Sequence, residues 1–435
     1  MIPGPVLALV LLARTVTLDE AERSAAAHFP QILAAQANTA AGVARTEQAR
    51  APLLPQVKLE AEYLRTTGNH VQKPGRSTVK SNSWQAFNWY DGALTGNLLL
   101  WDFGQAWNRW HAADARAVGL ADTELATRLE SLAGVRLAFF RARAEKALVV
   151  VAQETLANQQ RHLAQIQGFV EAGTRPEIDL AQGRADVAQS RVQLIAAENG
   201  YVLARAGLNQ AMGITGDTDY DVADQTLGPV EGESGPVDAL IDEAVRARPD
   251  IAALSAQVRA QELTARAARG AFFPTLSLQA GAADAGLHLF TQTIPNPPFP
   301  PLSFGMTWNV FAGVQLSWPL FQGFLTRGQV READAAADSA RAQREGLVQE
   351  VWVAVQQASC AVRSAKEALV AAGEVLTNAN ERLRLAEGRY AAGAGSIIEL
   401  ADAQLQATRA AAQEVGAEYD LSNARAQLAL ALARR

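Results

Sequence analysis

The sequence repeats itself at a fixed spacing, and this restricts the fold more than any other feature of the chain. Pro30-Gln31-Ile32 is matched 219 residues later (249 − 30) by Pro249-Asp250-Ile251. The segment around Gly173 is matched 220 residues later (393 − 173) by the segment around Gly393. Matches at one spacing along most of a chain are typical of a duplicated architecture. We therefore expect two halves that are built alike.

The expected halves are residues 17–212 and 237–435, joined by a connecting segment, residues 213–236. Glycines and acidic residues are frequent in the connecting segment, which predicts a linker on the surface. Residues 1–16 hold an apolar run, Val6–Ala13, with no basic residue before it and no clear small-residue cleavage site after it. Export signals usually have both. We expect either a degenerate export signal or an apolar N-terminal arm.

Heptad patterns predict very long helices in each half. A large residue recurs at every seventh position from Val348 to Tyr390, and a small residue follows three positions after most of them. The next helix carries a row of alanines at positions 403, 410, 417, 424 and 431. A large row beside a small row is typical of coiled coils whose helices approach closely. The expected long helices are residues 104–172, 176–211, 324–392 and 396–433.

Four segments alternate as β-strands do. Gln56–Tyr63 and Thr275–Ala280 alternate polar and apolar residues without a fault. Such alternation is typical of transmembrane β-barrels, and equally of a soluble sheet with one buried face. The expected strands are residues 56–64, 93–102, 275–282 and 309–321.

The distribution of tryptophan favours the membrane. Seven of the eight tryptophans lie close to the expected strands. Aromatic girdles at the two membrane interfaces explain such clustering. The residues expected at these interfaces are Trp84, Trp89, Trp101, Trp308 and Trp318. Because four strands cannot close a barrel and open sheet edges are not tolerated in lipid, the chain is expected to contribute to a symmetric oligomeric barrel.

Composition excludes several other classes of protein. A net charge of −6 argues against a nucleic-acid binder that depends on positive charge. The single cysteine, Cys360, excludes internal disulfides. No run of 18 apolar residues is present, which argues against membrane-spanning helices. The five histidines lack metal-binding spacing, and no nucleotide-binding or nucleophile motif occurs, so we expect no enzyme, no metal and no cofactor.

Together these elements resemble a known family. The chain is similar over essentially its whole length to the TolC family of outer-membrane efflux proteins. The resemblance is carried by the doubled Pro-Gln/Asp-Ile elements, by Pro52–Pro55 matched with Ala271–Pro274, by Trp318–Phe321 before Gly323, and by the paired glycine turns.

The resemblance implies a mainly α-helical protein with a β-barrel contribution. Each protomer would supply four transmembrane strands and long coiled-coil hairpins. A homotrimer would form a twelve-stranded barrel in the outer membrane and a helical tunnel through the periplasm. The implied function is the exit duct of a tripartite efflux or type I secretion system. The implied partners are a periplasmic adaptor protein, an inner-membrane pump or ABC transporter, and outer-membrane lipid, with no nucleic acid.

The same resemblance gives roles to residues at the helix tips. Asp179 and Tyr390 match a pair that keeps the periplasmic tip closed, and Glu399 and Asp402 match an aperture ring. The turn residues expected to dock the adaptor are Gly173, Thr174, Arg175, Gly393, Gly395 and Ser396.

The residues themselves leave two interpretations of the acidic pair open. Glu399 and Asp402 are three apart and so share one helical face. A threefold axis would gather six carboxylates, which attract cations and raise one another's pKa. A solvated helix start, where acidic residues are favoured by the helix dipole, explains the same pair.

Two tip positions depart from the family pattern. Gly395 stands where a basic residue is usual, and Ile178 stands where threonine is usual. A latch in this chain therefore has to be made differently, with Arg175 or Arg389 as the expected substitute.

The alternative is a soluble or periplasmic coiled-coil scaffold or adaptor. It explains the heptads but not the alternating strands or the tryptophans. Within the duct interpretation, drugs, metals and secreted proteins all stay open as cargo.

Overall fold

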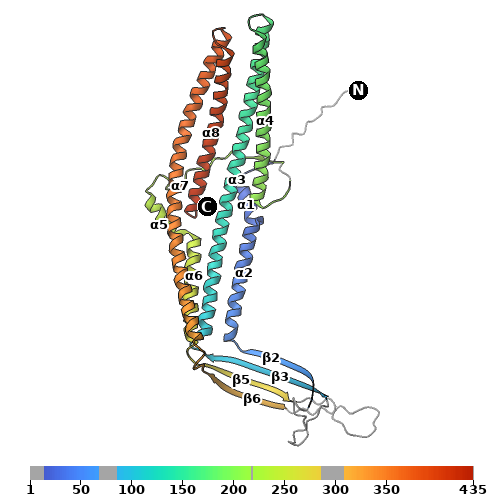
Figure 1. Cartoon of the computed structure of the whole chain (residues 1–435), viewed down its shortest axis with the longest axis vertical. Helices are drawn as coiled ribbons and strands as arrows, with labels where there is room; N and C mark the ends of the chain where they lie inside the picture. Colours follow the sequence, from blue (N-terminus) through green and yellow to red (C-terminus); the bar gives the residue numbers. More distant parts are fainter. Residues whose placement is uncertain (1–13, 68–85, 217–218, 286–307, 435) are drawn as a thin grey trace, which may run out of the picture. The chain divides into compact units, whose positions relative to one another are not determined.

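A computed structural model describes residues 14–67, 86–216, 219–285 and 308–434 (Figure 1). Within these ranges one order of elements occurs twice. The first half contains α1 (Leu18–His28), α2 (Pro30–Arg50), β2 (Gln56–Thr67), β3 (Ala86–Trp101), α3 (Gln105–Glu171) and α4 (Glu177–Met212). The second half contains α5 (Val237–Ala247), α6 (Pro249–Gly270), β5 (Thr275–Ala285), β6 (Trp308–Ser317), α7 (Leu325–Ala391) and α8 (Ile397–Ala431). A short 3₁₀ turn, η1 (Ala51–Leu53), precedes β2.

Corresponding elements of the two halves match in length, which confirms the internal repeat. Helices α3 and α7 each have 67 residues, and α4 and α8 have 36 and 35. Helices α1 and α5 each have 11. Among the described residues, none of the helices combines the length and the apolar character needed to cross a membrane.

The two compact units of the chain are not its two halves. One unit, called here the helical unit, comprises Met1–Thr39, Leu120–Ala253 and Arg344–Arg435. The other, called the sheet unit, comprises Ala40–Gly119 and Leu254–Gln343. Each unit therefore takes segments from both halves.

In the helical unit, the predicted alanine row is a packing surface. Ala403, Ala410, Ala417, Ala424 and Ala431 are all buried along α8. On α7 the predicted large and small rows also lie inward, as in Val355, Val362, Ala372 and Ala386. Small side chains allow two helix backbones to approach closely, so the heptad pattern positions this helix pair.

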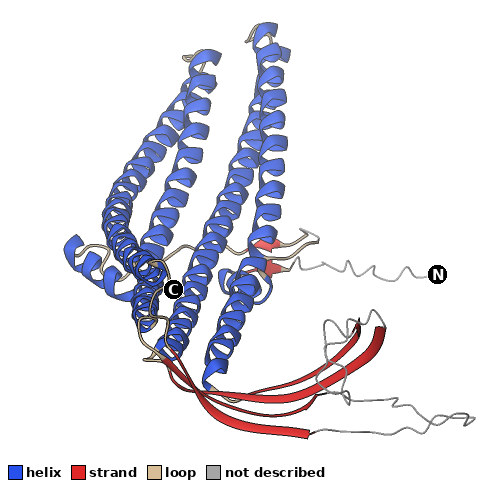
Figure 2. Ribbon diagram, turned by 60° about the horizontal axis from the view of Figure 1, so that its bottom comes forward, coloured by secondary structure: helices blue, strands red, loops and turns tan. Residues whose placement is uncertain are grey.

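In the sheet unit, four antiparallel strands form one sheet in the order β2-β3-β5-β6 (Figure 2). Their register places residues of one kind on one face. The apolar or small residues of that face are Val57, Leu59, Ala61, Tyr63, Leu94, Gly96, Leu98, Leu276, Leu278, Ala280, Ala282, Val310, Ala312, Val314 and Leu316. The opposite face carries Gln56, Lys58, Glu60, Glu62, Thr95, Asn97, Thr275, Ser277, Gln279, Gln315 and Ser317, with Leu64, Leu99 and Phe311 as large apolar exceptions.

The strand boundaries differ from those expected. Strand β3 begins at Ala86 instead of residue 93, and it carries an irregularity between Leu99 and Trp101. Strand β6 ends at Ser317 instead of residue 321, because Pro319 follows and has no amide hydrogen to continue a ladder.

The expected interface tryptophans are accounted for as follows. Trp84 lies outside the described residues, while Trp89 belongs to β3 and Trp308 begins β6. The side chains of Trp101 and Trp318 are 60% and 56% exposed. Trp107 and Trp110 lie in the first two turns of α3, directly after β3 and within the helix expected at residues 104–172.

The connecting segment lies mostly at the surface, but one part of it is ordered and anchored. Within it β4 (Asp221–Val222) pairs in parallel with β1 (Thr15–Val16), so ordered structure also begins before residue 17. Tyr220 and Val222 are buried in an apolar cluster of the helical unit. Ala223 and Leu227 also pack against this cluster, and Val230 packs against a second one, so a few apolar side chains hold the segment in place.

Two equivalent sites bind the connecting segment to the long helices. In the first half, Lys146 of α3 contacts the Asp221 carboxylate at 2.6 Å, and Arg205 of α4 donates to the Tyr220 carbonyl at 2.9 Å. The residues 220 positions later are Lys366 (366 − 146) and Arg425 (425 − 205). These two contact the Glu233 carboxylate at 2.6 and 3.2 Å.

The carboxyl group of Glu233 is held ionised by these contacts. Burial raises its pKa, but hydrogen bonds from Lys366, from the Val230 amide and from Arg425 outweigh burial, so the pKa lies below the ordinary glutamate value. A depressed carboxyl pKa stabilises the fold above the unfolded-state value, and this stabilisation is lost as pH falls through the folded-state value.

We predict that Glu233→Gln lowers the free energy of unfolding by about 1–3 kcal/mol at pH 7, because two cations lose their charged partner. Urea unfolding in detergent measures this difference. The difference from wild type should shrink as pH falls below about 4.3, because the carboxyl of the unfolded chain is protonated there and that of the folded protein is protonated at still lower pH. Glu231→Gln, two residues away and exposed, serves as the control. Equal stability of all three proteins at pH 7 would refute the role of Glu233.

Candidate functional site

Two glycine turns join the long helices at their far ends, α3 to α4 and α7 to α8 (Figure 1). Gly173 and Gly393 have φ of 73° and 78°, a left-handed conformation that glycine adopts readily at helix ends. The residue after each glycine donates its amide hydrogen to the same helical position: Thr174 to the Phe169 carbonyl and Ala394 to the Arg389 carbonyl, both at 2.9 Å. The turns therefore share one backbone design.

The starts of the following helices differ. Ser396 caps α8, since its hydroxyl accepts a hydrogen bond from the Glu399 amide at 3.1 Å. Helix α4 follows Pro176, which makes no side-chain cap. The second turn is thus capped by its own serine, whereas in the first turn the Thr174 hydroxyl donates to the Phe169 carbonyl at 2.9 Å.

An apolar cluster lies just inside the two turns. Its buried members come from α3, α7 and α8, and they are Ile166, Ala386, Tyr390, Leu400 and Ala403. The cluster joins the two halves, because α3 belongs to the first half and α7 and α8 to the second.

Arg175 of the first turn contacts the second turn through its guanidinium group. Its Nη2 donates to the carbonyl of Tyr390 and to the carbonyl of Gly395, each at 3.2 Å. Its guanidinium carbon lies 4.5 Å from the centroid of the Tyr390 ring, which is a cation–π contact. A cation at the C-terminal end of α7 is also favoured by the helix dipole.

Asp179 and Tyr390 meet beneath this contact, as the sequence predicts. Both are buried, and the Tyr390 hydroxyl lies 3.5 Å from Asp179 Oδ2, a long hydrogen bond. Burial and the nearby Asp179 charge raise the pKa of Tyr390, although Arg175 opposes them. The hydroxyl therefore keeps its proton and donates a hydrogen bond to the Asp179 carboxylate.

Gly395 has little space for a side chain. A Cβ atom there would lie 3.1 Å from the Tyr390 amide nitrogen and 3.2 Å from Arg389. The absence of the usual basic residue at this position fits the backbone, and the Arg175 guanidinium binds the Gly395 carbonyl instead.

The two acidic residues of the expected aperture are not equivalent. Glu399 forms an ion pair with Arg389 at 3.1 Å, which partly offsets its charge. Asp402 is exposed. The structure thus brings Asp179, Tyr390, Arg175 and Gly395 together. The sequence analysis did not predict the Arg389–Glu399 ion pair. The two residues flank the Gly393 turn at a spacing of ten, and that spacing of opposite charges could have indicated it.

Comparison with known proteins gives the chain its family. The profile of the outer membrane efflux protein family matches residues 23–214 and 240–434, one match in each half. A probable efflux pump outer membrane protein, SepC of Pseudomonas putida, is 29% identical over 202 residues, covering 46% of this chain and 41% of SepC. The chain thus spans less than half the length of that relative.

Other relatives match over more of their length. The solvent efflux pump outer membrane protein SrpC of Pseudomonas putida is 26% identical over 84% of this chain and 75% of its own. The pyoverdine export protein OpmQ, also of Pseudomonas putida, is 26% identical over 95% of this chain and 84% of its own.

Solved structures share the fold. The outer membrane protein VceC of Vibrio cholerae superposes with a TM-score of 0.80 at 17% identity, over 96% of both chains. The MtrE outer membrane channel of Neisseria gonorrhoeae gives a TM-score of 0.75 at 19% identity, over 96% of this chain and 89% of MtrE. With both halves matched by the family profile, the chain belongs to the outer membrane efflux protein family.

Proposed function

We propose that this outer-membrane protein is the exit duct of a tripartite efflux or type I secretion system. The observation that carries the proposal is the register of the sheet, which collects apolar residues on one face and polar residues on the other. An apolar face toward lipid and a polar face toward a water-filled lumen is the arrangement of a transmembrane β-barrel. A coiled-coil adaptor, the alternative, has no use for such a sheet.

The outer strands support a trimer. Within the described residues, β2 and β6 each pair on one side only. Lipid does not tolerate open edges, so these edges need partners. Since β2 and β6 run in opposite directions in the sheet, β6 of one copy can pair with β2 of the next in the same antiparallel pattern. Three copies then close a twelve-stranded barrel.

The cargo follows from the pump that supplies it. Relatives are named for toluene efflux, solvent efflux and pyoverdine export. Such different cargoes passing through one fold support a duct that accepts what an inner-membrane pump and its periplasmic adaptor deliver. We assign the tip turns of Gly173–Arg175 and Gly393–Ser396 as the adaptor's docking site.

We propose that Arg175, with Tyr390 and Asp179, forms the latch that keeps the tip closed. Arg175 holds two carbonyls of the second turn, and the buried Tyr390–Asp179 contact lies directly beneath it. Both contacts join the first half to the second, so opening of the tip has to break them. Hydrogen bonds to a charged group contribute about 1.5–3 kcal/mol each, which is enough to shift a closed–open equilibrium about tenfold or more.

We propose that Asp402 carries most of the cation attraction at the aperture. Its carboxylate is exposed, whereas that of Glu399 is paired with Arg389. Three exposed carboxylates around a threefold axis favour cations over anions.

The first prediction from the proposed function tests which face of the sheet contacts lipid. Val314→Arg should reduce the fraction of protein that assembles in lipid vesicles at least tenfold, because a charge on the lipid face costs about 2–4 kcal/mol near the bilayer centre. Gln315→Arg, the next residue and on the opposite face, should assemble normally. Gel shift of the unheated trimer measures assembly. Equal loss in both variants would argue against the assigned faces.

The second prediction tests the latch. Arg175→Ala should raise the resting conductance of single channels in planar bilayers about tenfold or more, and should sensitise cells to large antibiotics. Asp179→Ala and Tyr390→Phe should act in the same direction with a smaller effect. Arg184→Ala, an exposed arginine on α4, is the matched control. Resting conductance at the wild-type level in Arg175→Ala would contradict the latch.

The third prediction tests the aperture. Asp402→Asn should lower the cation-to-anion permeability ratio, measured from reversal potentials in a salt gradient, by several-fold. Glu399→Gln should lower it less, since Arg389 already offsets that charge. A larger effect of Glu399→Gln would reverse the assignment.

A further inference from the structure

Between the apolar cluster at the tip and the base of the helical unit, the two halves meet through polar side chains. Thr155 of α3 lies 3.2 Å from Thr408 of α8, hydroxyl to hydroxyl. One turn farther along, Gln159 Nε2 donates to Gln404 Oε1 at 3.0 Å. These two pairs are called here the polar seam. They lie where coiled coils usually place apolar side chains.

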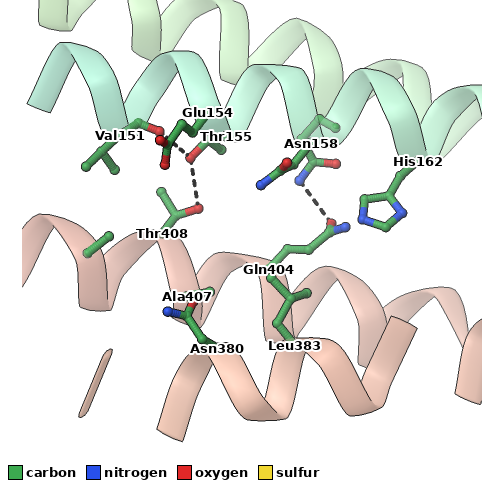
Figure 3. Close-up of a pocket in the computed structure, with 12 residues that line it drawn as sticks. Val151, Glu154, Thr155, Asn158, His162, Asn380, Leu383, Gln404, Ala407 and Thr408 are labelled. Atoms are coloured by element: carbon green, nitrogen blue, oxygen red, sulfur yellow. Dashed lines mark hydrogen bonds between the residues drawn. The ribbon is translucent and has the colours of Figure 1, made fainter. Parts of the chain in front are cut away.

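The seam lines a half-open cavity of about 90 Å³ between α3, α7 and α8 (Figure 3). Gln404 and Thr408 point from α8 toward α3, where Thr155 and Asn158 face them (Figure 3). His162 closes one end, and its Nε2 lies 3.2 Å from the Glu387 carboxylate of α7. The volume is enough for several water molecules, and polar groups surround it.

The side-chain amide of Gln404 is only partly hydrogen-bonded: its oxygen has a partner and its nitrogen has none among the described residues. Gln404 is 7% exposed. An amide left unpaired in a protein interior is costly, which is why such groups are satisfied by protein or by ordered water. The cavity beside Gln404 offers a place for that water.

We propose that the seam binds a cluster of internal water molecules, anchored on Gln404 Nε2, that lets α7 and α8 move against α3 when the tip opens. This proposal rests on the proposed duct function. Water bridges are nearly as favourable as direct hydrogen bonds and can be exchanged as the helices shift. An interdigitated apolar contact would have to be pulled apart instead.

The experiment compares two double variants. Gln159→Leu with Gln404→Leu makes the seam apolar. Gln160→Leu with Gln406→Leu makes the same changes on the same helices, at exposed neighbours outside the seam. Thermal unfolding in detergent gives the stability of each trimer, and drug export in cells that carry the pump and adaptor gives its function.

The seam variant, Gln159→Leu with Gln404→Leu, should unfold at a temperature equal to or above that of wild type, because two paired polar groups are replaced together by apolar ones. Its drug export should fall at least fourfold, while the control keeps wild-type values of both. A seam variant that unfolds earlier, or that exports as well as wild type, would overturn the proposal.

A high-resolution map of the wild-type trimer adds a test that needs no transport. Ordered water within hydrogen-bonding distance of Gln404 Nε2 is the expected result, and a dry cavity would refute the water site. If the wild-type protein supports no export at all, the proposed duct function fails instead, and the map still decides the water site.

Discussion

Close packing along the alanine row of α8 is the constraint on which the rest of the helical unit depends. Each buried alanine of that row allows α8 to lie close against its neighbours, and the row continues for most of the helix. Helices packed at such short range cannot also carry bulky side chains at the contact. The large buried residues gather in three clusters, one beneath the tip turns and two beside the connecting segment, and alanines of the row take part in two of them.

This division gives the helical unit regions of different strength. Apolar clusters and buried carboxylate contacts hold the helices near the connecting segment. The tip is held by one small cluster and by the Arg175 contacts. Between them lies the polar seam. This distribution of contacts suits the proposed function, in which the base of the helical unit stays packed while the tip opens.

Much of this fold could be predicted from sequence because it rests on periodic patterns. The repeat, the four long helices and the two faces of the sheet all follow from spacings of 220, seven and two residues. The Asp179–Tyr390 contact came from resemblance. The hydrogen bond from Arg175 to the Gly395 carbonyl joins residues 220 positions apart. It depends on the rotamer of one side chain, and no local sequence pattern specifies a rotamer. The burial of Tyr220 and Val222 could not be predicted because the few apolar residues of the connecting segment are scattered, with no helical or strand period.

The sheet affects how prone the protomer is to aggregate before it assembles in the membrane. Within the described residues, the apolar face is flanked by two strands that each pair on one side only, and such surfaces favour β-rich aggregation. In the proposed barrel this face and both edges become covered only when lipid and neighbouring copies are present. The unassembled protomer is therefore the form of the protein with the greatest tendency to aggregate.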